Sequence, residues 1–179
     1  MARASMPRSA TVLVIRHAEK SGDKQDIGLT PAGQARAQAY VAYFQTLTSG
    51  ASHLPPPAWL IAAADEKDSH RSRLTLEPLA AALGLPIDAR LADADYRTLA
   101  QRLREDAHYD GATTLICWTH KKLPGLAKSL GAPASLLPAK WPDEVFGWML
   151  RLDYDAAGEL AEATLHNQRL MFNDCGAEP

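Results

Sequence analysis

The stretch "TVLVIRHAEK", residues 11–20, decides how the rest of the chain is interpreted. It opens with five apolar or β-branched residues, Thr11 to Ile15, and a short uninterrupted run of this kind is typical of a strand buried on both faces. Arg16 and His17 follow at once. Because parallel sheets bind ligands beyond the carboxyl ends of their strands, these two polar side chains mark a candidate site.

The residues that follow predict a helix. Thr30 precedes Pro31, and a threonine N-cap before a proline at the first helical position is a common way for a helix to begin. Apolar residues then recur at helical spacing, which gives the helix one apolar stripe made of Tyr40, Phe44 and Leu47.

Strands and helices alternate through most of the remaining chain. We expect strands at 59–63, 85–89 and 111–118, and helices at 71–83, 96–107 and 123–132. Gly84 ends the first of these helices, and Pro78 is expected to kink it or to divide it into two pieces. This order predicts an α/β fold with a mostly parallel central sheet and helices on both faces.

An antiparallel pair is expected near the C-terminus. In residues 145–155 the apolar side chains alternate, as in a strand with one buried face, at Phe146, Trp148, Leu150 and Leu152. Residues 159–170 follow across Gly158 and are expected to pair with this strand.

Length and composition narrow the class of protein. The 179 residues suit one domain, expected at 11–172 between a loose leader, 1–10, and a tail, 173–179. A net charge of −2 gives no reason to expect nucleic acid or an acidic membrane surface as partner. Two cysteines are too few for a disulfide framework, and neither a signal peptide nor a membrane span is evident. A cytoplasmic protein is the default expectation, and the oligomeric state stays open.

Three predicted strands bring polar side chains to one edge of the sheet. Their carboxyl ends lie at Arg16, at Ala63–Ala64 and at Trp118–His120, and Arg71 follows shortly after the second. Two histidines with arginines beside them make a poor zinc site, because the arginines repel a cation. They suit a tetrahedral dianion, since guanidinium groups bind phosphate oxygens in pairs and a neutral imidazole can attack phosphorus.

Four motifs in order resemble the histidine phosphatase superfamily, also called phosphoglycerate mutase-like. "VIRHAEK" is similar to its Arg-His-Gly motif, with Ala18 in place of glycine, and "GLTPAGQARA" to its Leu-Thr-x-x-Gly-x-x-Gln-Ala segment. "SHRSRLTLEPLAAALGLPI" resembles its Arg-x-x-x-Thr stretch, and "LICWTHKKLPGLAKSLG" the strand that delivers its second histidine. The resemblance runs from about residue 11 to 152.

The resemblance implies a phosphatase that needs no metal and no cofactor. The family's nucleophilic histidine falls on His17, and attack on phosphorus would give a phosphohistidine that water hydrolyses. Its two phosphate-binding arginines fall on Arg16 and Arg71, and its second histidine on His120. The implied substrate is a phosphomonoester or phosphoramidate, on a small molecule or a protein side chain. The alternative is a module of the same fold that binds a phosphorylated ligand without turnover.

Two assignments near Arg71 have rivals. Arg73 lies two residues from Arg71, so the two point in different directions on a helix, and we expect Arg73 to be a solvated charge. Ser69 is expected to cap the helix rather than to touch phosphate.

The general acid is the least determined role. In one branch of the family a glutamate lies in a Leu-x-Glu-x-Asp-Tyr-Gly-like segment, and here "LADADYR" has Asp93 at that place, with Asp95 as its rival. Another branch has an aspartate after the second histidine, where this chain has Lys121. Glu19 is expected to pair with Lys20 or Lys121 or to orient a neighbour. Thr119 departs from the glycine that many members have before the second histidine.

Overall fold

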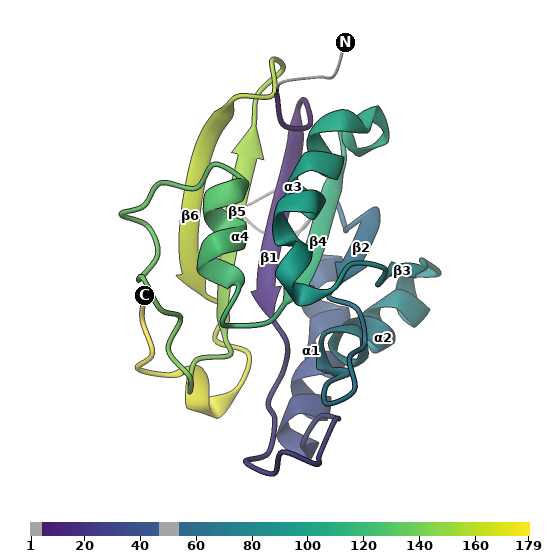
Figure 1. Cartoon of the computed structure of the whole chain (residues 1–179), viewed down its shortest axis with the longest axis vertical. Coiled ribbons are helices and arrows are strands. Elements are labelled where there is room, and N and C mark those ends of the chain that lie inside the picture. The colour runs from purple at the N-terminus through teal and green to yellow at the C-terminus, as the bar shows by residue number, and fades with distance from the viewer. Residues whose placement is uncertain (1–4, 47–53) are drawn as a thin grey trace.

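A six-stranded sheet forms the centre of the computed structural model, which describes residues 5–46 and 54–179 (Figure 1). The spatial order is β3-β2-β4-β1-β5-β6, and the strands span β1 Ala10–Arg16, β2 Trp59–Ala62, β3 Ile87–Asp88, β4 Thr113–Trp118, β5 Trp148–Tyr154 and β6 Leu160–Asn167. β3, β2, β4 and β1 are parallel to one another, β5 is antiparallel to β1, and β6 is antiparallel to β5. The predicted α/β class with antiparallel C-terminal strands is therefore confirmed.

β1 lies in the middle of the sheet, as its apolar sequence predicts. All seven of its residues are buried, and its side chains alternate between two separate hydrophobic cores. Val12 and Val14 belong to one core, and Leu13 and Ile15 to the other. The covered faces of β1 take the apolar residues Val12 to Ile15, and Arg16 and His17 lie at the carboxyl end of the strand.

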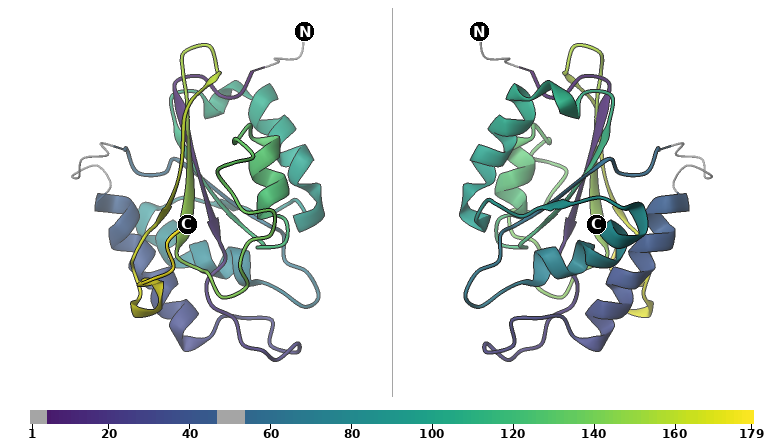
Figure 2. Two further views of the ribbon diagram at one scale, coloured as in Figure 1. Left: turned by 90° about the vertical axis from the view of Figure 1, so that its left-hand side faces the viewer. Right: turned by 90° about the vertical axis from the view of Figure 1, so that its right-hand side faces the viewer.

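Helices cover both faces of the sheet (Figure 2). α1 Pro31–Thr46 and α2 Arg71–Leu83 supply Tyr40, Phe44, Leu76 and Leu79 to the core of Leu13 and Ile15. α3 Tyr96–Glu105 and α4 Leu123–Ser129 cover the opposite face, with Leu99, Leu103 and Leu126 in the core of Val12 and Val14. Three 3₁₀ turns complete the elements at Asp93–Asp95, Ala107–Tyr109 and Phe172–Asp174.

The predicted ends of the two longest helices are correct. Thr30 Oγ1 accepts a hydrogen bond from the Gly33 N–H at 3.1 Å, so Thr30 caps α1. Gly84 ends α2 in the left-handed conformation, with φ of 66°. Leu47, the last residue of the expected apolar stripe, lies outside the described residues.

Two local features differ from the expectations. Pro78 lies inside one continuous α2, which excludes a division into two pieces, while the alternative of a kink stays a prediction. Phe146 is not part of β5, which begins at Trp148; its ring lies over Arg16 instead of joining the buried face of the strand. The turn between β5 and β6 is at Gly158, as predicted: its φ is 80°, and a Cβ there would lie 2.2 Å from the Met6 carbonyl oxygen.

Both ends of the described chain contact the sheet region. Met6, in the segment expected as a leader, is buried and donates its N–H to the Gly158 carbonyl at 3.1 Å. Asp174, in the segment expected as a tail, is 4% exposed. The division of the chain into leader, domain and tail stays a prediction. No helix among the described residues combines the length and the apolar character that crossing a bilayer needs.

Candidate active site

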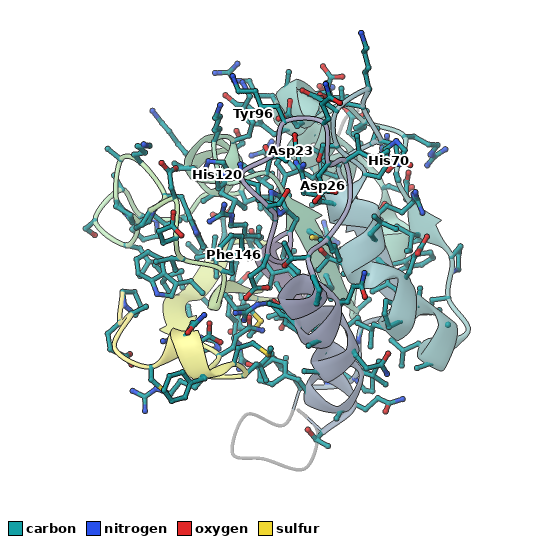
Figure 3. All side chains as sticks on the ribbon, turned by 90° about the horizontal axis from the view of Figure 1, so that it is seen from below. Asp23, Asp26, His70, Tyr96, His120 and Phe146 are labelled. Carbon is teal, nitrogen blue, oxygen red and sulfur yellow. The ribbon has the colours of Figure 1, made fainter. Side chains whose placement is uncertain are left out.

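Two hollows open at the edge of the sheet where β2, β4 and β1 end. Figure 3 looks at the molecule from this side, with His120 and Phe146 among the labelled side chains. The smaller one has about 220 Å³ and is lined by four of the five predicted site residues, His17, Arg71, Asp93 and His120. The larger one has about 960 Å³ and adds the fifth, Arg16, while Arg71 and His120 line both. The structure thus brings all five predicted residues together, although they come from four separate segments of the chain.

His17 is held in the state that a nucleophile needs. The residue is 3% exposed, and its Nδ1 lies 2.8 Å from the Ala18 carbonyl oxygen. Because a carbonyl only accepts, Nδ1 carries the hydrogen and the lone pair of the neutral ring lies on Nε2. Burial, together with Arg16 and Arg71, lowers the pKa of His17 to about 3. His17 is therefore neutral at physiological pH.

Arg16 is buried, and two of its three side-chain nitrogens have no partner in the described structure. Its Nη1 donates to three main-chain carbonyls, those of Asp143 at 2.7 Å, Val145 at 2.9 Å and Pro142 at 3.4 Å. Its Nε and Nη2 are buried and have no partner among the described residues. The Phe146 ring lies 3.8 Å from its Cζ, and burial lowers the pKa of Arg16 to about 10.

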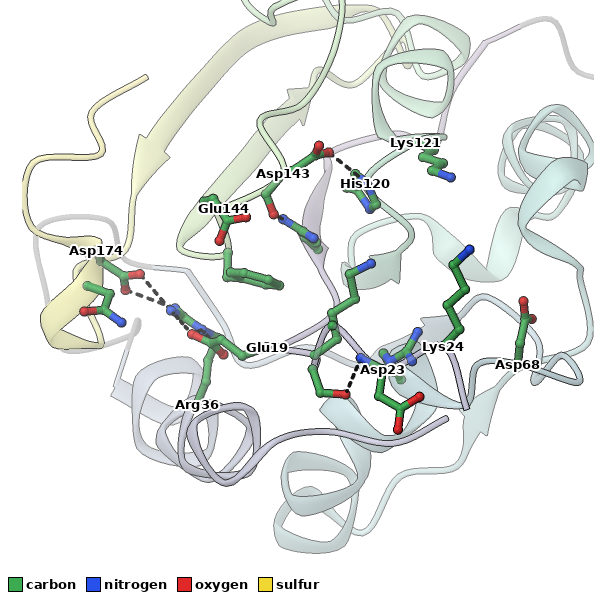
Figure 4. A pocket seen from close by; sticks show the side chains of 17 residues that line it. Glu19, Asp23, Lys24, Arg36, Asp68, His120, Lys121, Asp143, Glu144 and Asp174 are labelled. Carbon is green, nitrogen blue, oxygen red and sulfur yellow. Dashed lines mark hydrogen bonds and ion pairs between the residues drawn. The ribbon is translucent and has the colours of Figure 1, made fainter. Parts of the chain in front are cut away.

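His120 also has a buried nitrogen without a partner. Its Nε2 lies 3.2 Å from Asp143 Oδ1, while its Nδ1 makes no hydrogen bond within the described part of the chain (Figure 4). Burial and the neighbouring Arg16 lower the pKa of His120 to about 4. Arg16 Nε, Arg16 Nη2 and His120 Nδ1 are the only buried side-chain nitrogens or oxygens of the described residues that lack a partner.

Arg71 is held at the cavity by the loop that follows β1. Its Nε donates to the Gly28 carbonyl at 3.0 Å and its Nη2 to the Asp26 carbonyl. One turn along α2, Thr75 Oγ1 accepts the Ala18 N–H at 2.9 Å and donates to the Arg71 carbonyl at 2.7 Å. The Arg-x-x-x-Thr spacing therefore fixes both the arginine and the main chain next to His17, since positions four apart share a helix face.

Arg73 points away from both hollows. It pairs with Asp65 and Glu77 at the surface, as expected of a solvated charge. The expectation that Ser69 caps α2 is wrong: His70 is the N-cap residue and no side chain caps the helix. Ser69 Oγ accepts instead from Arg71 Nη1 at 3.4 Å.

Asp93 lines the smaller hollow, whereas its rival Asp95 is exposed and lines neither hollow. Asp93 Oδ2 accepts from the Thr119 hydroxyl at 2.9 Å, and its main-chain carbonyl accepts from the Trp118 indole at 3.0 Å. Two departures from the family pattern, aspartate for glutamate and threonine for glycine, thus contact each other directly.

Glu19 pairs with Arg36, not with Lys20 or Lys121. Arg36 bonds both oxygens of Glu19 at 2.7–3.0 Å and both oxygens of Asp174 at 2.7 and 3.0 Å (Figure 4). Burial opposes the charge of Arg36, but these two carboxylates outweigh it and raise the pKa of Arg36 above its usual range. The main chain of Glu19 also packs closely on α1, because a Cβ on Gly33 would lie 2.4 Å from the Glu19 carbonyl oxygen.

Sequence reasoning missed the network residues Arg36 and Asp174 and the loop residues Asp143 and Phe146. One signal was present: Arg36 occupies the place of glutamine in the Leu-Thr-x-x-Gly-x-x-Gln-Ala segment, three residues after Gly33. No group of three or more histidine, cysteine, aspartate or glutamate side chains in the described ranges is arranged to hold a metal ion.

Comparison with known proteins places the fold. No family model matches the sequence, and no curated protein matches it. Solved structures do match, among them a candidate phosphohistidine phosphatase, SixA, from Agrobacterium tumefaciens, with a TM-score of 0.54, 18% identity and coverage of 87% of this chain and 97% of that one. A candidate α-ribazole-5′-phosphate phosphatase from Escherichia coli has a TM-score of 0.54, 18% identity and coverage of 88% and 96%.

A mycobacterial glucosyl-3-phosphoglycerate phosphatase solved with inorganic phosphate also matches, with a TM-score of 0.51, 15% identity and coverage of 87% and 95%. These likenesses cover most of each chain at low identity, so they establish the architecture and not the activity. The chain has the fold of the phosphoglycerate mutase-like histidine phosphatases.

Proposed function

We propose that this chain is a metal-independent phosphatase that hydrolyses a phosphomonoester or a phosphoramidate through a phosphohistidine on His17. One observation carries the proposal. The buried side-chain atoms without a partner in the described residues are Arg16 Nε, Arg16 Nη2 and His120 Nδ1, and both residues line the larger hollow. Buried polar groups normally have partners, so two open Arg16 donors and an open His120 nitrogen at one hollow imply a ligand rich in acceptor oxygens. A phosphoryl group is such a ligand.

The reaction has two steps. His17 Nε2 attacks phosphorus, a P–N bond forms, and the bond from phosphorus to the leaving oxygen or nitrogen breaks. Asp93 supplies the proton that the leaving group takes. Water then attacks the phosphohistidine and gives its proton to Asp93, the P–N bond breaks, and inorganic phosphate leaves. Together the two steps return His17 and Asp93 to their starting states.

Arg16, Arg71 and His120 stabilise the transition state of both steps. Charge shifts onto the equatorial oxygens as phosphorus passes between nucleophile and leaving group, and donors fixed in advance bind that charge without reorganising. Arg16 and Arg71 are each fixed by main-chain carbonyls, of residues 142–145 and of the 26–28 segment respectively. Their guanidinium groups therefore keep their places when the substrate is absent.

Rapid-quench labelling tests the proposal. A radiolabelled phosphodonor should leave an acid-labile, base-stable adduct that maps to His17 and is absent from the His17→Ala variant. Label on Cys117 or on a serine, or measurable turnover with no adduct, would contradict it. Phosphate binding without any turnover would identify the chain as a binding module of this fold.

A further inference from the structure

One residue of the loop that leads into β5, Asp143, contacts both Arg16 and His120, whose buried nitrogens lack partners in the described structure. Its main-chain carbonyl accepts from Arg16 Nη1 at 2.7 Å, and its carboxylate Oδ1 lies 3.2 Å from His120 Nε2. The other carboxylate oxygen lies 3.3 Å from Lys140 Nζ. In Figure 4 the Asp143 side chain points to His120 from the side opposite Lys121.

These contacts determine which nitrogen of His120 carries a hydrogen. Lys140 lowers the pKa of the Asp143 carboxyl further below neutrality, and His120 and Arg16 act in the same direction. An ionised carboxylate only accepts, so His120 Nε2 carries the hydrogen. In the neutral ring the buried Nδ1 then has a lone pair, which repels the oxygen of a phosphate dianion. A hydrogen bond between Nδ1 and that oxygen needs one more proton.

We propose that Asp143 is a positioning residue for His120: it holds Nε2–H so that Nδ1 faces the phosphoryl group, and it favours the extra proton that this nitrogen needs. Binding of a phosphate dianion then takes up a proton at His120. The inference rests on the proposed function for the place of the phosphoryl group. Its test uses phosphate binding alone, so it remains decisive even if the chain turns nothing over.

The charges around His120 oppose this proton in the free protein. Cations act on it from β1, from the segment after β1 and from its own segment, and Asp143 is the anion that opposes them. The charged or titratable residues that share a hollow with His120 are Arg16, His17, Glu19, Lys20, Asp23, Lys24, Arg36, Glu66, Asp68, Arg71, Asp93, Lys121, Asp143, Glu144 and Asp174. A bound dianion offsets the cations, and Asp143 then decides how readily the proton is taken up.

Calorimetric titration with inorganic phosphate in buffers of different ionisation enthalpy measures this uptake. At about pH 8, above the second ionisation of a phosphate, the wild-type protein should take up close to one proton for each phosphate bound. Asp143→Asn keeps the main-chain carbonyl on Arg16 and keeps an acceptor for Nε2, but it removes the charge. Because Asp143 is 57% exposed and solvent screens it, we expect phosphate to bind about three- to fivefold more weakly.

The pH dependence of uptake provides the second readout. The pH at which uptake is half complete should fall by about half a unit in Asp143→Asn, because a loss of this size corresponds to about half a pKa unit. Glu144→Gln is the matched control: the residue is next in the same loop and lines the same hollow, and no contact with His120 is found for it in the described structure. It should keep the wild-type midpoint.

Three results would overturn the inference. Phosphate binding by the wild-type protein without proton uptake is the first, and an unchanged midpoint in Asp143→Asn is the second. An equal shift in Glu144→Gln would be the third, because it would assign the effect to the general charge of the loop. A failure of the His17 labelling experiment would overturn the phosphatase proposal and leave these three outcomes unaffected.

Discussion

Arg16 and Arg36 are both almost fully buried near the same cavity, and their surroundings are opposite. Arg36 contacts two carboxylates, and all of its donor nitrogens have partners. Arg16 contacts only main-chain carbonyls through one nitrogen, and its other two nitrogens have no partner among the described residues. Burial lowers the pKa of Arg16, whereas Asp174 and Glu19 overcome burial and raise the pKa of Arg36.

The difference separates an arginine whose donors are all satisfied within the fold from one whose open donors fit the proposed phosphate ligand. For a buried charge with its counter-charges in place, the free energy of unfolding falls strongly when one partner is removed. A buried charge without counter-charges lowers stability until an anion arrives, and such local conflicts are expected at functional sites. Arg16 and Arg36 are both buried, so residue type and burial do not separate the two cases; the partners of each guanidinium group do.

The largest expected effect on stability is at Arg36. Arg36→Met leaves the buried carboxylate of Asp174 without its counter-charge and should lower the free energy of unfolding by about 3–5 kcal/mol in urea titrations. Arg73→Met, which removes exposed pairs with Asp65 and Glu77, should lower it by less than about 1 kcal/mol. Equal losses in the two variants would remove the basis for calling Arg36 structural.

The Arg71→Ala variant tests whether an arginine at the cavity acts on the proposed substrate. Arg71→Ala should lower kcat/KM by about 10² or more, because it removes a fixed donor to the transition state. Arg73→Ala should change kcat/KM little, since Arg73 lines neither hollow. The reverse order in steady-state assays would show that the phosphate-binding arginine is the other one.

Asp93 should matter in proportion to the basicity of the leaving group. Asp93→Asn should lower kcat/KM for an alkyl phosphate by about 10²–10⁴, the usual range for general acid catalysis, and for an aryl phosphate far less. An aryl oxide departs without help, whereas an alkoxide needs the proton. Asp95→Asn is the control, because Asp95 lines neither hollow. Equal losses on both substrates would make Asp93 structural.

The smallest expected effect is that of chelation. Arg16 and Arg71 already supply positive charge at the cavity, and a divalent cation there would be repelled. Activity should therefore be unchanged after treatment with EDTA. Loss of activity that zinc or magnesium restores would point to a metallohydrolase.

Part of the fold and of the candidate site could be predicted from the sequence. The buried run of β1 predicts its place in the sheet, and three strand ends at one edge predict the meeting of His17, Arg71 and His120. Local periodicity carries this information, because strand and helix spacing decide which side chains share a face. The same rule separates Arg71 from Arg73, whereas the choice of Arg71 came from the resemblance to the Arg-x-x-x-Thr motif; Arg71 lines both hollows and Arg73 lines neither.

The residues that satisfy or orient these side chains were not predictable in this way. Asp143 comes from an irregular segment and Asp174 from a three-residue 3₁₀ turn, and Arg16 and Asp143 are 127 positions apart in the chain. Segments without periodic structure give no rule for where a side chain points. Phe146 shows the related error: its spacing fits a strand face, but the strand begins two residues later and the ring packs on Arg16.

Arg16 should lower the free energy of unfolding until it binds an anion, and the Arg16→Met variant measures this effect. Unfolding in urea should be measured with and without inorganic phosphate for this variant and for the wild type. We expect Arg16→Met to be at least as stable as the wild type without phosphate, because the substitution removes an uncompensated buried charge. Phosphate should stabilise the wild type as a ligand of the native state and leave the variant unchanged. Arg16 would not be the anion-binding arginine if Arg16→Met were destabilised as strongly as Arg36→Met and were still stabilised by phosphate.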